Sequence, residues 1–251
     1  MIVLITGASA GFGEAMARRF IAGGHRVIAT ARRVDRLNRL HEELGDNLLP
    51  LALDVRDPDA IARALSGLPA DWQPVEVLIN NAGLALGTEP AQQCSLAEWM
   101  TMIDTNVKGL TALTHALLPG MVARNSGLII NLGSIAGSTP YPGGNVYGAT
   151  KAFVAQFTRN LRADLVGTGV RATNLAPGLV GGTEFSNVRY HGDDAAAARV
   201  YEGTVPLTAG DIAETAYWIA TLPPHININH IEMMPTCQGY GALAIRRSPK
   251  A

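Results

Sequence analysis

Charged residues are scarce in this chain, and the two signs nearly cancel. Only 16% of its 251 residues are charged, and 20 Lys and Arg against 21 Asp and Glu give a formal net charge of −1. Globular proteins typically carry about 25% charged residues. Because no run of basic residues occurs, the chain lacks the electrostatic footprint of a protein that binds nucleic acid or an anionic membrane, and we expect neither partner.

Long apolar runs and paired cysteines are also missing. No apolar stretch reaches the roughly 18 residues that a membrane-spanning helix needs, and the apolar N-terminus precedes Arg18 and Arg19, the reverse of a secretory signal. Cys94 and Cys237 lie far apart without CxxC spacing, which favours reduced thiols over a disulfide. The histidines form no H-x-x-x-H pair, so we expect no metal site. These features predict a cytoplasmic protein.

Short aliphatic runs alternate with longer segments of helical period along the whole chain. The runs are continuous in Val, Ile and Leu, as is typical of parallel strands buried on both faces. Strands are predicted at residues 2–6, 26–30, 48–53, 75–80, 127–132, 170–175 and 226–233. Helices are predicted at residues 12–22, 35–44, 58–65, 96–118, 146–165 and 208–222. The alternation predicts an α/β fold: one Rossmann domain over residues 1–251, a doubly wound parallel sheet of about seven strands with helices on both faces.

The segment 178–203 has the least regular pattern in the chain. In a compact domain, a stretch of that length without secondary structure of its own is usually a lid or a binding loop. We therefore predict that residues 178–203 form a substrate lid.

A glycine-rich turn connects the first predicted strand to the first predicted helix. Gly7, Gly11 and Gly13 allow a tight turn, a close approach to a pyrophosphate, and packing of the helix against the strand. The helix N-terminus supplies free N–H groups for the phosphates. The spacing is G-x-x-x-G-x-G, which departs from the usual G-x-G-x-x-G fingerprint. The turn nevertheless predicts a dinucleotide phosphate site.

The same turn also contains G-x-S-x-G, the nucleophile elbow of α/β-hydrolases, with Ser9 as its serine. Asp211 and His230 follow in the order that such a triad requires. However, the elbow would stand on the first strand, with nothing before it to build an oxyanion-hole loop, and Gly13 would have no role. A serine hydrolase remains the less favoured alternative.

Arg32 and Arg33 stand at the end of the second predicted strand, where an NAD site has an acidic residue for the ribose 2′-hydroxyl. Two guanidinium groups suit an adenosine 2′-phosphate instead. We therefore predict NADP rather than NAD. Asp54 follows the third strand, and two roles suit it: a contact with the adenine of the cofactor, or the cap of the next helix. The turn at residues 80–83, after the fourth strand, lets backbone lie against a ribose.

Tyr147 and Lys151 lie four residues apart at the start of a predicted helix, and therefore on one face of it. Ser134 follows the fifth predicted strand. An ammonium about 4 Å from a phenol, at an effective dielectric near 20, contributes roughly 4 kcal/mol, enough to lower a tyrosine pKa from about 10 to about 7. An oxidised nicotinamide ring adds positive charge in the same direction, and we predict that Tyr147 is thereby poised for proton transfer near neutral pH. The alternative is an ordinary Tyr–Lys pair on a helix surface.

These motifs, in this order over about 250 residues, resemble the short-chain dehydrogenases/reductases. They are residues 6–13 and 80–83, Asn106, Ser134, Tyr147 and Lys151. The resemblance implies that Ser134 orients the substrate oxygen and that Tyr147 is the general acid/base. It also implies that Lys151 holds the nicotinamide ribose, that Asn106 anchors a water in the proton relay, and that the lid covers the nicotinamide.

Stretches such as 81–87, 141–147 and 177–185 are similar to one group of that family, the NADP-dependent 3-hydroxy acid dehydrogenases, which act on serine, L-allo-threonine and malonic semialdehyde. The similarity implies NADP(H) as cofactor. The cofactor contacts expected from the motifs and this similarity are Gly7, Ala8, Ser9, Ala10, Gly11, Phe12, Gly13, Arg32, Arg33, Asp54, Val55, Asn81, Ala82, Gly83, Tyr147, Lys151, Pro177, Gly178, Val180 and Thr183. The alternatives are a broad-specificity carbonyl reductase or ketoreductase of the same fold and a non-catalytic NADP(H) sensor.

The helices predicted at 96–118 and 146–165 carry more apolar residues than one core-facing stripe needs, which fits subunit contacts. The family resemblance implies a homotetramer.

A 3-hydroxy acid carries a carboxylate, which needs a cation or amide donors. Arg189, in the predicted lid, is the nearest guanidinium without another assignment. We predict that Arg189 contacts the substrate together with Ser134 and Tyr147. An ordinary surface arginine is the alternative.

Overall fold

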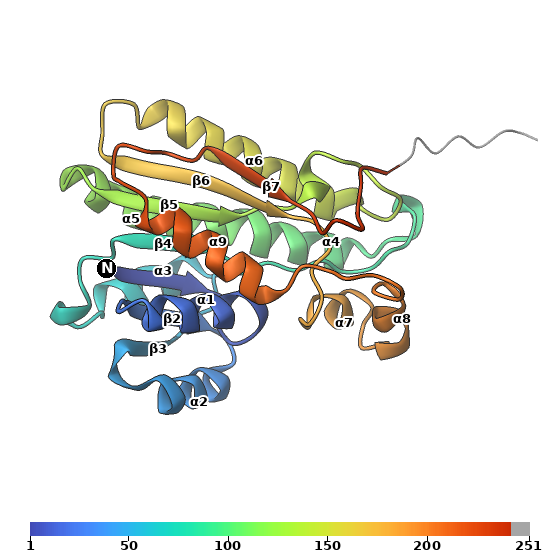
Figure 1. Ribbon diagram of the computed structural model, residues 1–251, viewed down its shortest axis with the longest axis horizontal. Helices are drawn as coiled ribbons and strands as arrows, with labels where there is room; N and C mark the ends of the chain where they lie inside the picture. Colours follow the sequence, from blue (N-terminus) through green and yellow to red (C-terminus); the bar gives the residue numbers. More distant parts are fainter. Residues whose placement is uncertain (242–251) are drawn as a thin grey trace, which may run out of the picture.

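Seven parallel strands form the centre of the computed structural model, in the order β3-β2-β1-β4-β5-β6-β7 (Figure 1). The strands are β1 (Ile2–Thr6), β2 (Arg26–Ala31), β3 (Leu48–Ala52), β4 (Val77–Asn80), β5 (Gly127–Leu132), β6 (Val170–Pro177) and β7 (His230–Met233). The structure describes residues 1–241, so the end of the predicted domain, residues 242–251, lies outside the described residues. The predicted doubly wound α/β fold with seven strands is confirmed.

Helices cover both faces of this sheet. They are α1 (Gly11–Ala22), α2 (Val34–Leu44), α3 (Pro58–Ser66), α4 (Leu96–Ile103), α5 (Leu110–Ala123), α6 (Asn145–Asp164), α7 (Phe185–Arg189), α8 (Asp194–Arg199) and α9 (Ala209–Thr221). On one face α1, α2 and α9 pack in a cluster with Ile5 of β1, and on the other α3, α5 and α6 pack with its neighbour Leu4. Successive strand residues point to opposite faces, so the continuous aliphatic runs supply both cores at once.

Two element boundaries differ from the prediction for identifiable reasons. Strand β7 begins at His230 and not at residue 226, because the side chain of Asn227 exchanges two hydrogen bonds with the backbone of Ala172. An amide side chain thus takes the place of the strand ladder there. The predicted helix 96–118 is divided by a π-helical turn, Asp104–Gly109, between α4 and α5. A Cβ at Gly109 would overlap Val55, which shows how closely this turn approaches the loop after β3.

The segment 178–203 is more regular than predicted, since it contains both α7 and α8. It leaves the carboxyl end of β6, and α7 and α8 lie together beyond that end of the sheet (Figure 1). The hydroxyl groups of Ser186 and Tyr201 lie 2.7 Å apart and connect the two ends of this segment. The strand order reverses between β1 and β4, and the carboxyl ends of strands at such a reversal form the usual binding crevice of this architecture. No helix among residues 1–241 is long and apolar enough to span a bilayer.

Candidate active site

A cavity of about 750 Å³ opens at the carboxyl ends of the strands. The turn after β1, the loops after β2 to β5, the start of α6 and the 178–203 segment all contribute to its walls. The predicted site residues that line it are Gly7, Ser9, Ala10, Gly11, Phe12, Arg32, Arg33, Asp54, Val55, Asn81, Ala82, Gly83, Ser134, Tyr147, Lys151, Pro177, Gly178, Val180, Thr183 and Arg189. Ala8, Gly13 and Asn106 are not among the lining residues.

The turn after β1 has the backbone geometry that its glycines predict. Gly7 and Gly11 have φ angles of 67° and 58°, in the left-handed region that favours glycine. A Cβ at Gly13 would overlap the carbonyl oxygen of Gly7, so Gly13 packs α1 against the turn from behind. The buried Ala8 donates its N–H to the Thr30 carbonyl at 3.0 Å. No side chain caps α1, which leaves its first N–H groups available to an anion.

The loop after β4 is fixed to the end of β1. The Asn81 side chain donates to the Thr6 carbonyl at 2.7 Å, and the Asn81 backbone N–H donates to Thr6 Oγ1 at 2.9 Å. These bonds hold the loop so that a Cβ on Gly83 would lie 3.4 Å from Lys151 Nζ. Glycine at position 83 therefore keeps the backbone open toward the ammonium.

Asn106 connects this loop to α6 from inside the protein. It is 2% exposed and stands in the π-helical turn. Its Nδ2 donates to the Leu84 carbonyl at 2.9 Å and to Thr150 Oγ1 at 3.0 Å, and its Oδ1 accepts from the Leu84 N–H at 2.9 Å. Asn106 thus positions the residue next to Lys151, while the predicted role in anchoring a water stays a prediction.

Ser134, Tyr147 and Lys151 converge on one part of the cavity from the end of β5 and the first turns of α6. Tyr147 and Lys151 are each only 8% exposed. Lys151 Nζ donates to the Leu132 carbonyl at 2.7 Å and lies 5.9 Å from the centroid of the Tyr147 ring. Within residues 1–241 no carboxylate forms an ion pair with this ammonium.

Burial shifts the pKa values of Tyr147 and Lys151 in the directions that favour their neutral forms. It raises the pKa of Tyr147 to about 12, against the opposing influences of the Ser134 hydroxyl and the Arg189 guanidinium. It lowers the pKa of Lys151 to about 8. Without a cofactor the loss of hydration outweighs the nearby positive charge, and the predicted fall in the Tyr147 pKa, which includes the charge of an oxidised nicotinamide, stays a prediction. At neutral pH the phenol is a proton donor.

Arg189, at the end of α7, points its guanidinium toward the same part of the cavity. Its Nε donates to the Gly87 carbonyl at 3.2 Å, its Nη1 to Tyr141 Oη at 3.0 Å, and its Nη2 to the Gly143 carbonyl at 3.2 Å. All three acceptors are neutral, and Arg189 Cζ lies 5.9 Å from the Tyr147 ring centroid. The guanidinium therefore brings a positive charge close to the buried phenol.

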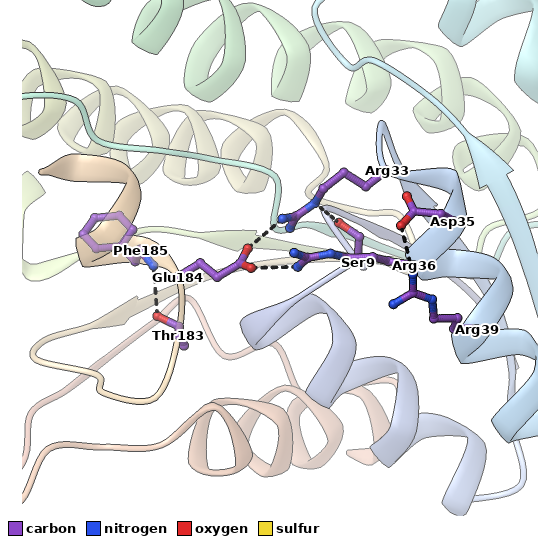
Figure 2. Close-up of polar contacts among 8 residues, drawn as sticks. All are labelled: Ser9, Arg33, Asp35, Arg36, Arg39, Thr183, Glu184 and Phe185. Carbon is purple, nitrogen blue, oxygen red and sulfur yellow. Dashed lines mark hydrogen bonds and ion pairs between the residues drawn. The ribbon is translucent and has the colours of Figure 1, made fainter. Parts of the chain in front are cut away.

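Arg33 and Arg32 line the opposite end of the cavity, next to the glycine turn. Arg33 Nε donates to Ser9 Oγ at 3.2 Å, and Arg33 Nη1 donates to the Glu184 carboxylate at 2.8 Å (Figure 2). Glu184 also accepts from Arg36 Nη1 at 2.7 Å. The guanidinium groups of Arg33 and Arg36 thus bind the Glu184 carboxylate beside the glycine turn.

Asp54 lines the cavity and does not cap a helix. Arg56 Nη2 lies 2.6 Å from Asp54 Oδ2, and this hydrogen bond is the main reason that the pKa of Asp54 is lowered. The cap of α3 is Asp57, which accepts from the N–H groups of Asp59 and Ala60. Of the two readings of Asp54, the helix cap is wrong and the adenine contact stays a prediction.

The serine-hydrolase alternative finds no triad in this geometry. The Ser9 hydroxyl contacts Arg33, while Asp211 closes the capping box of α9. The His230 ring bonds to Asn174 on β6. Residues 1–241 contain no group of three His, Cys, Asp or Glu side chains suited to a metal ion.

Sequence reasoning missed several residues that line the cavity or contact it. Arg36 lies three residues after Arg33, one helical turn along, and that spacing was a usable signal. Glu184 lies in the stretch 177–185, which the similarity to the 3-hydroxy acid dehydrogenases already associates with the cofactor. Its pairing with Arg33 and Arg36, and the positions of Tyr141 and Gln238 at the cavity, come only from the fold.

The buried ammonium has a measurable effect on stability. The Lys151 pKa is about 8 in the folded protein against 10.5 for a free lysine, so burial of its charge opposes folding below pH 8, and the penalty disappears above pH 10.5. The full difference corresponds to roughly 3 kcal/mol. We expect Lys151→Met to unfold at higher urea concentration than the wild type at pH 7, with a gap in unfolding free energy that shrinks toward pH 10.5. An equal gap at both pH values would contradict the burial argument.

Comparisons with known proteins agree with this geometry. The family model described as short chain dehydrogenase matches residues 1–193. The chain is 61% identical over 247 residues to the NADP-dependent 3-hydroxy acid dehydrogenase YdfG of Escherichia coli (strain K12), covering 98% of this chain and 100% of the relative. It is 53% identical over 249 residues to sulfoacetaldehyde reductase 2 of Chromohalobacter salexigens, covering 98% of each. Its structure matches the closed form of a serine dehydrogenase complexed with NADP+, with a TM-score of 0.98, 61% identity, and coverage of 99% of this chain and 100% of that one. The chain therefore belongs to the short-chain dehydrogenase family.

Proposed function

We propose that the protein is an NADP-dependent oxidoreductase that transfers a hydride to or from carbon 3 of small 3-hydroxy acids, such as serine, L-allo-threonine and 3-hydroxypropionate with its oxo form, malonic semialdehyde. One observation carries the proposal: Ser134, Tyr147 and Lys151 line the same cavity as the glycine turn. The chain that places them there is 61% identical, over 98% of its length, to an NADP-dependent 3-hydroxy acid dehydrogenase. The serine dehydrogenase complexed with NADP+ supports the same cofactor.

The residues present fit NADP(H). Gly7 and Gly11 at positive φ and the uncapped start of α1 suit a pyrophosphate. Arg32 and Arg33 suit the adenosine 2′-phosphate. Arg33 already binds one anion, the Glu184 carboxylate. When bound, the nicotinamide supplies the hydride chemistry. Lys151 is the residue that we assign to its ribose.

Tyr147 Oη is the proton donor in the reductive direction and the acceptor in the oxidative direction. The raised pKa of Tyr147 favours the neutral phenol, which is the form that protonates a developing alkoxide. The Ser134 hydroxyl donates to the same substrate oxygen and orients it. In the oxidative direction the phenolate needs positive charge, which Lys151 and Arg189 supply, each 5.9 Å from the ring centroid. Asn106 would anchor a water that passes the proton on from this group.

Arg189 is the residue that we assign to the substrate carboxylate. Its three acceptors are two backbone carbonyls and the Tyr141 hydroxyl, and an anion is a stronger partner for a guanidinium than any of them. Because Arg189 stands on α7 in the 178–203 segment, a substrate anion would draw that segment over the cavity as a lid.

We also propose a homotetramer in the cytoplasm. Leu96 and Met100 on α4 are 69% and 48% exposed, and Phe153 on α6 is 38% exposed and stacks on Phe157. Apolar side chains on these two helices suit subunit contacts, and the free cysteines Cys94 and Cys237 suit a reducing compartment. Light scattering at micromolar concentration is expected to give four times the 26.5 kDa chain mass. A monomer would contradict this assembly.

The function itself is tested by initial rates of NADP+ reduction. We expect L-serine, L-allo-threonine and 3-hydroxypropionate to give higher kcat/KM values than uncharged alcohols of similar size. Tyr147→Phe is expected to lower kcat by about 10²–10⁴-fold, the usual contribution of a general acid or base, while NADP+ binds with nearly the same Kd. Tyr190→Phe, which changes another phenol of the same cavity, is the matched control.

Equal efficiency on uncharged ketones would make the protein a broad-specificity carbonyl reductase instead. Binding of NADP(H) without turnover of any hydroxy acid or carbonyl would make it a sensor. Either result would contradict the proposed function.

The role of Arg189 predicts a charge-dependent defect. We expect Arg189→Ala to raise the KM for serine about tenfold or more, because it removes a charge-assisted hydrogen bond worth about 1.5–3 kcal/mol, while kcat/KM for an uncharged alcohol falls less, through the loss of the charge beside Tyr147 alone. Arg199→Ala, on the neighbouring helix α8, is the control. Equal losses on the charged and uncharged substrates would show that Arg189 supports only the loops that it contacts.

A further inference from the structure

Two arginines and one glutamate form a cluster at the adenosine end of the cavity, which we call the clasp (Arg33, Arg36 and Glu184). Arg33 follows β2, Arg36 stands in the first turns of α2, and Glu184 immediately precedes α7. Arg33 Nη1 donates to Glu184 Oε2 at 2.8 Å, and Arg36 Nη1 donates to Glu184 Oε1 at 2.7 Å. Figure 2 shows both guanidinium groups converging on the single carboxylate. Each carboxylate oxygen therefore has its own arginine.

The clasp lies against the proposed phosphate site. Arg33 also donates from Nε to Ser9 Oγ at 3.2 Å, and Ser9 belongs to the glycine turn. Arg33, Ser9 and Glu184 all line the cavity. The two arginines lower the pKa of Glu184, so this carboxylate is an anion at neutral pH. The anion consequently stands beside the turn where a dinucleotide would place its adenosine ribose.

An incoming dianion can open the clasp. The side chains of Arg33, Arg36 and Glu184 are 44%, 38% and 45% exposed, and ion pairs at that exposure contribute little net free energy. A phosphate monoester carries a higher charge than a carboxylate and three acceptor oxygens, and it matches paired guanidinium groups well. Glu184 next to such a phosphate would repel it. The two anions therefore compete for the same pair of arginines.

We propose that Arg36 is a further ligand of the adenosine 2′-phosphate beside Arg32 and Arg33, and that the Glu184 carboxylate takes the place of this phosphate until NADP(H) binds and displaces it. The proposal rests on the proposed use of NADP(H) and adds two determinants of the choice between NADP and NAD. Arg36 strengthens binding of the phosphorylated cofactor. Glu184 limits that binding by competition and has no effect on a cofactor without the 2′-phosphate.

Arg39 is a built-in control for the charge of Arg36. It lies one turn further along α2 and pairs with Asp35 at 3.7 Å, away from Glu184 (Figure 2). Arg36→Ala and Arg39→Ala each remove one positive charge from the same helix. A difference between them therefore reports contact with the phosphate and not the general electrostatic field.

Isothermal titration of the full-length protein with 2′,5′-ADP and with 5′-ADP tests the role of Arg36 without any turnover. We expect Arg36→Ala to weaken binding of 2′,5′-ADP about tenfold or more, since a hydrogen bond to a charged group contributes about 1.5–3 kcal/mol, and to leave the Kd of 5′-ADP within twofold. Arg39→Ala is expected to leave both within twofold. Wild-type affinity for 2′,5′-ADP in Arg36→Ala, or equal weakening of both ligands, would overturn the assignment.

Glu184→Gln tests the competition. Removal of the negative charge is expected to tighten 2′,5′-ADP binding at least threefold and to leave 5′-ADP unchanged. Glu43→Gln, which removes a carboxylate paired with Arg18 on the surface, is the matched control. Weaker binding of 2′,5′-ADP by Glu184→Gln would mean that Glu184 supports the two arginines, and an unchanged Kd would mean that it does not compete. Either result overturns the displacement.

The same titrations separate this inference from the proposed cofactor. Wild-type protein that binds 2′,5′-ADP no more tightly than 5′-ADP would contradict the use of NADP(H) itself. A wild-type preference for 2′,5′-ADP that persists in Arg36→Ala would contradict only the role of Arg36.

Discussion

The arrangement of the site depends on a phenol and an ammonium buried together at the end of β5. Tyr147 and Lys151 share one face of α6, and the backbone carbonyl of Leu132 accepts a hydrogen bond from the ammonium. Burial raises the pKa of Tyr147 and lowers that of Lys151, so the charged form of each group is less favourable here than in water. A protein selected for stability alone would have an apolar pair in this position. This cost in stability supports the catalytic role that we propose for these two side chains.

The rest of the fold holds this pair next to a phosphate site. Parallel strands end at the same edge of the sheet, so the turn after β1 and the loops after β4 and β5 meet at one cavity. The bond between Asn81 and Thr6 fixes the loop after β4 to the end of β1. Asn106 fixes the same loop to α6 through its bond to Thr150. Because Thr6, Asn106 and Thr150 are buried and hydrogen-bonded, the distance between the glycine turn and the phenol is set by the core of the protein.

Much of this architecture could be predicted from the sequence, because its signals are local. Continuous aliphatic runs identified the buried strands, and glycines 7 and 11 predicted the tight turn, in which both residues have positive φ. Side chains that replace backbone interactions were invisible to such patterns: Asn227 delays the start of β7 to His230 through its bonds to Ala172. Contacts between distant segments were equally invisible, and the clasp joins residues 33 and 184 across 151 positions.

In the protein without cofactor, the Tyr147 pKa shifts in the direction opposite to the effect of the ammonium alone, for a quantitative reason. The spacing of Tyr147 and Lys151 predicts an ammonium about 4 Å from the phenol in a medium of effective dielectric near 20. The structure places the ammonium 5.9 Å from the ring centroid and buries the phenol. Burial then dominates, and extra positive charge from a bound oxidised nicotinamide is needed to stabilise the phenolate.

The most direct measurement is the titration of Tyr147 itself, followed by NMR of protein labelled with ¹³C at the tyrosine Cζ and assigned with Tyr147→Phe. The account predicts a pKa of about 12 in the free protein and a lower pKa with NADP+ bound. A tyrosine at position 147 that ionises at or below pH 10 in the free protein would contradict it, since 10 is the ordinary value of a solvated phenol.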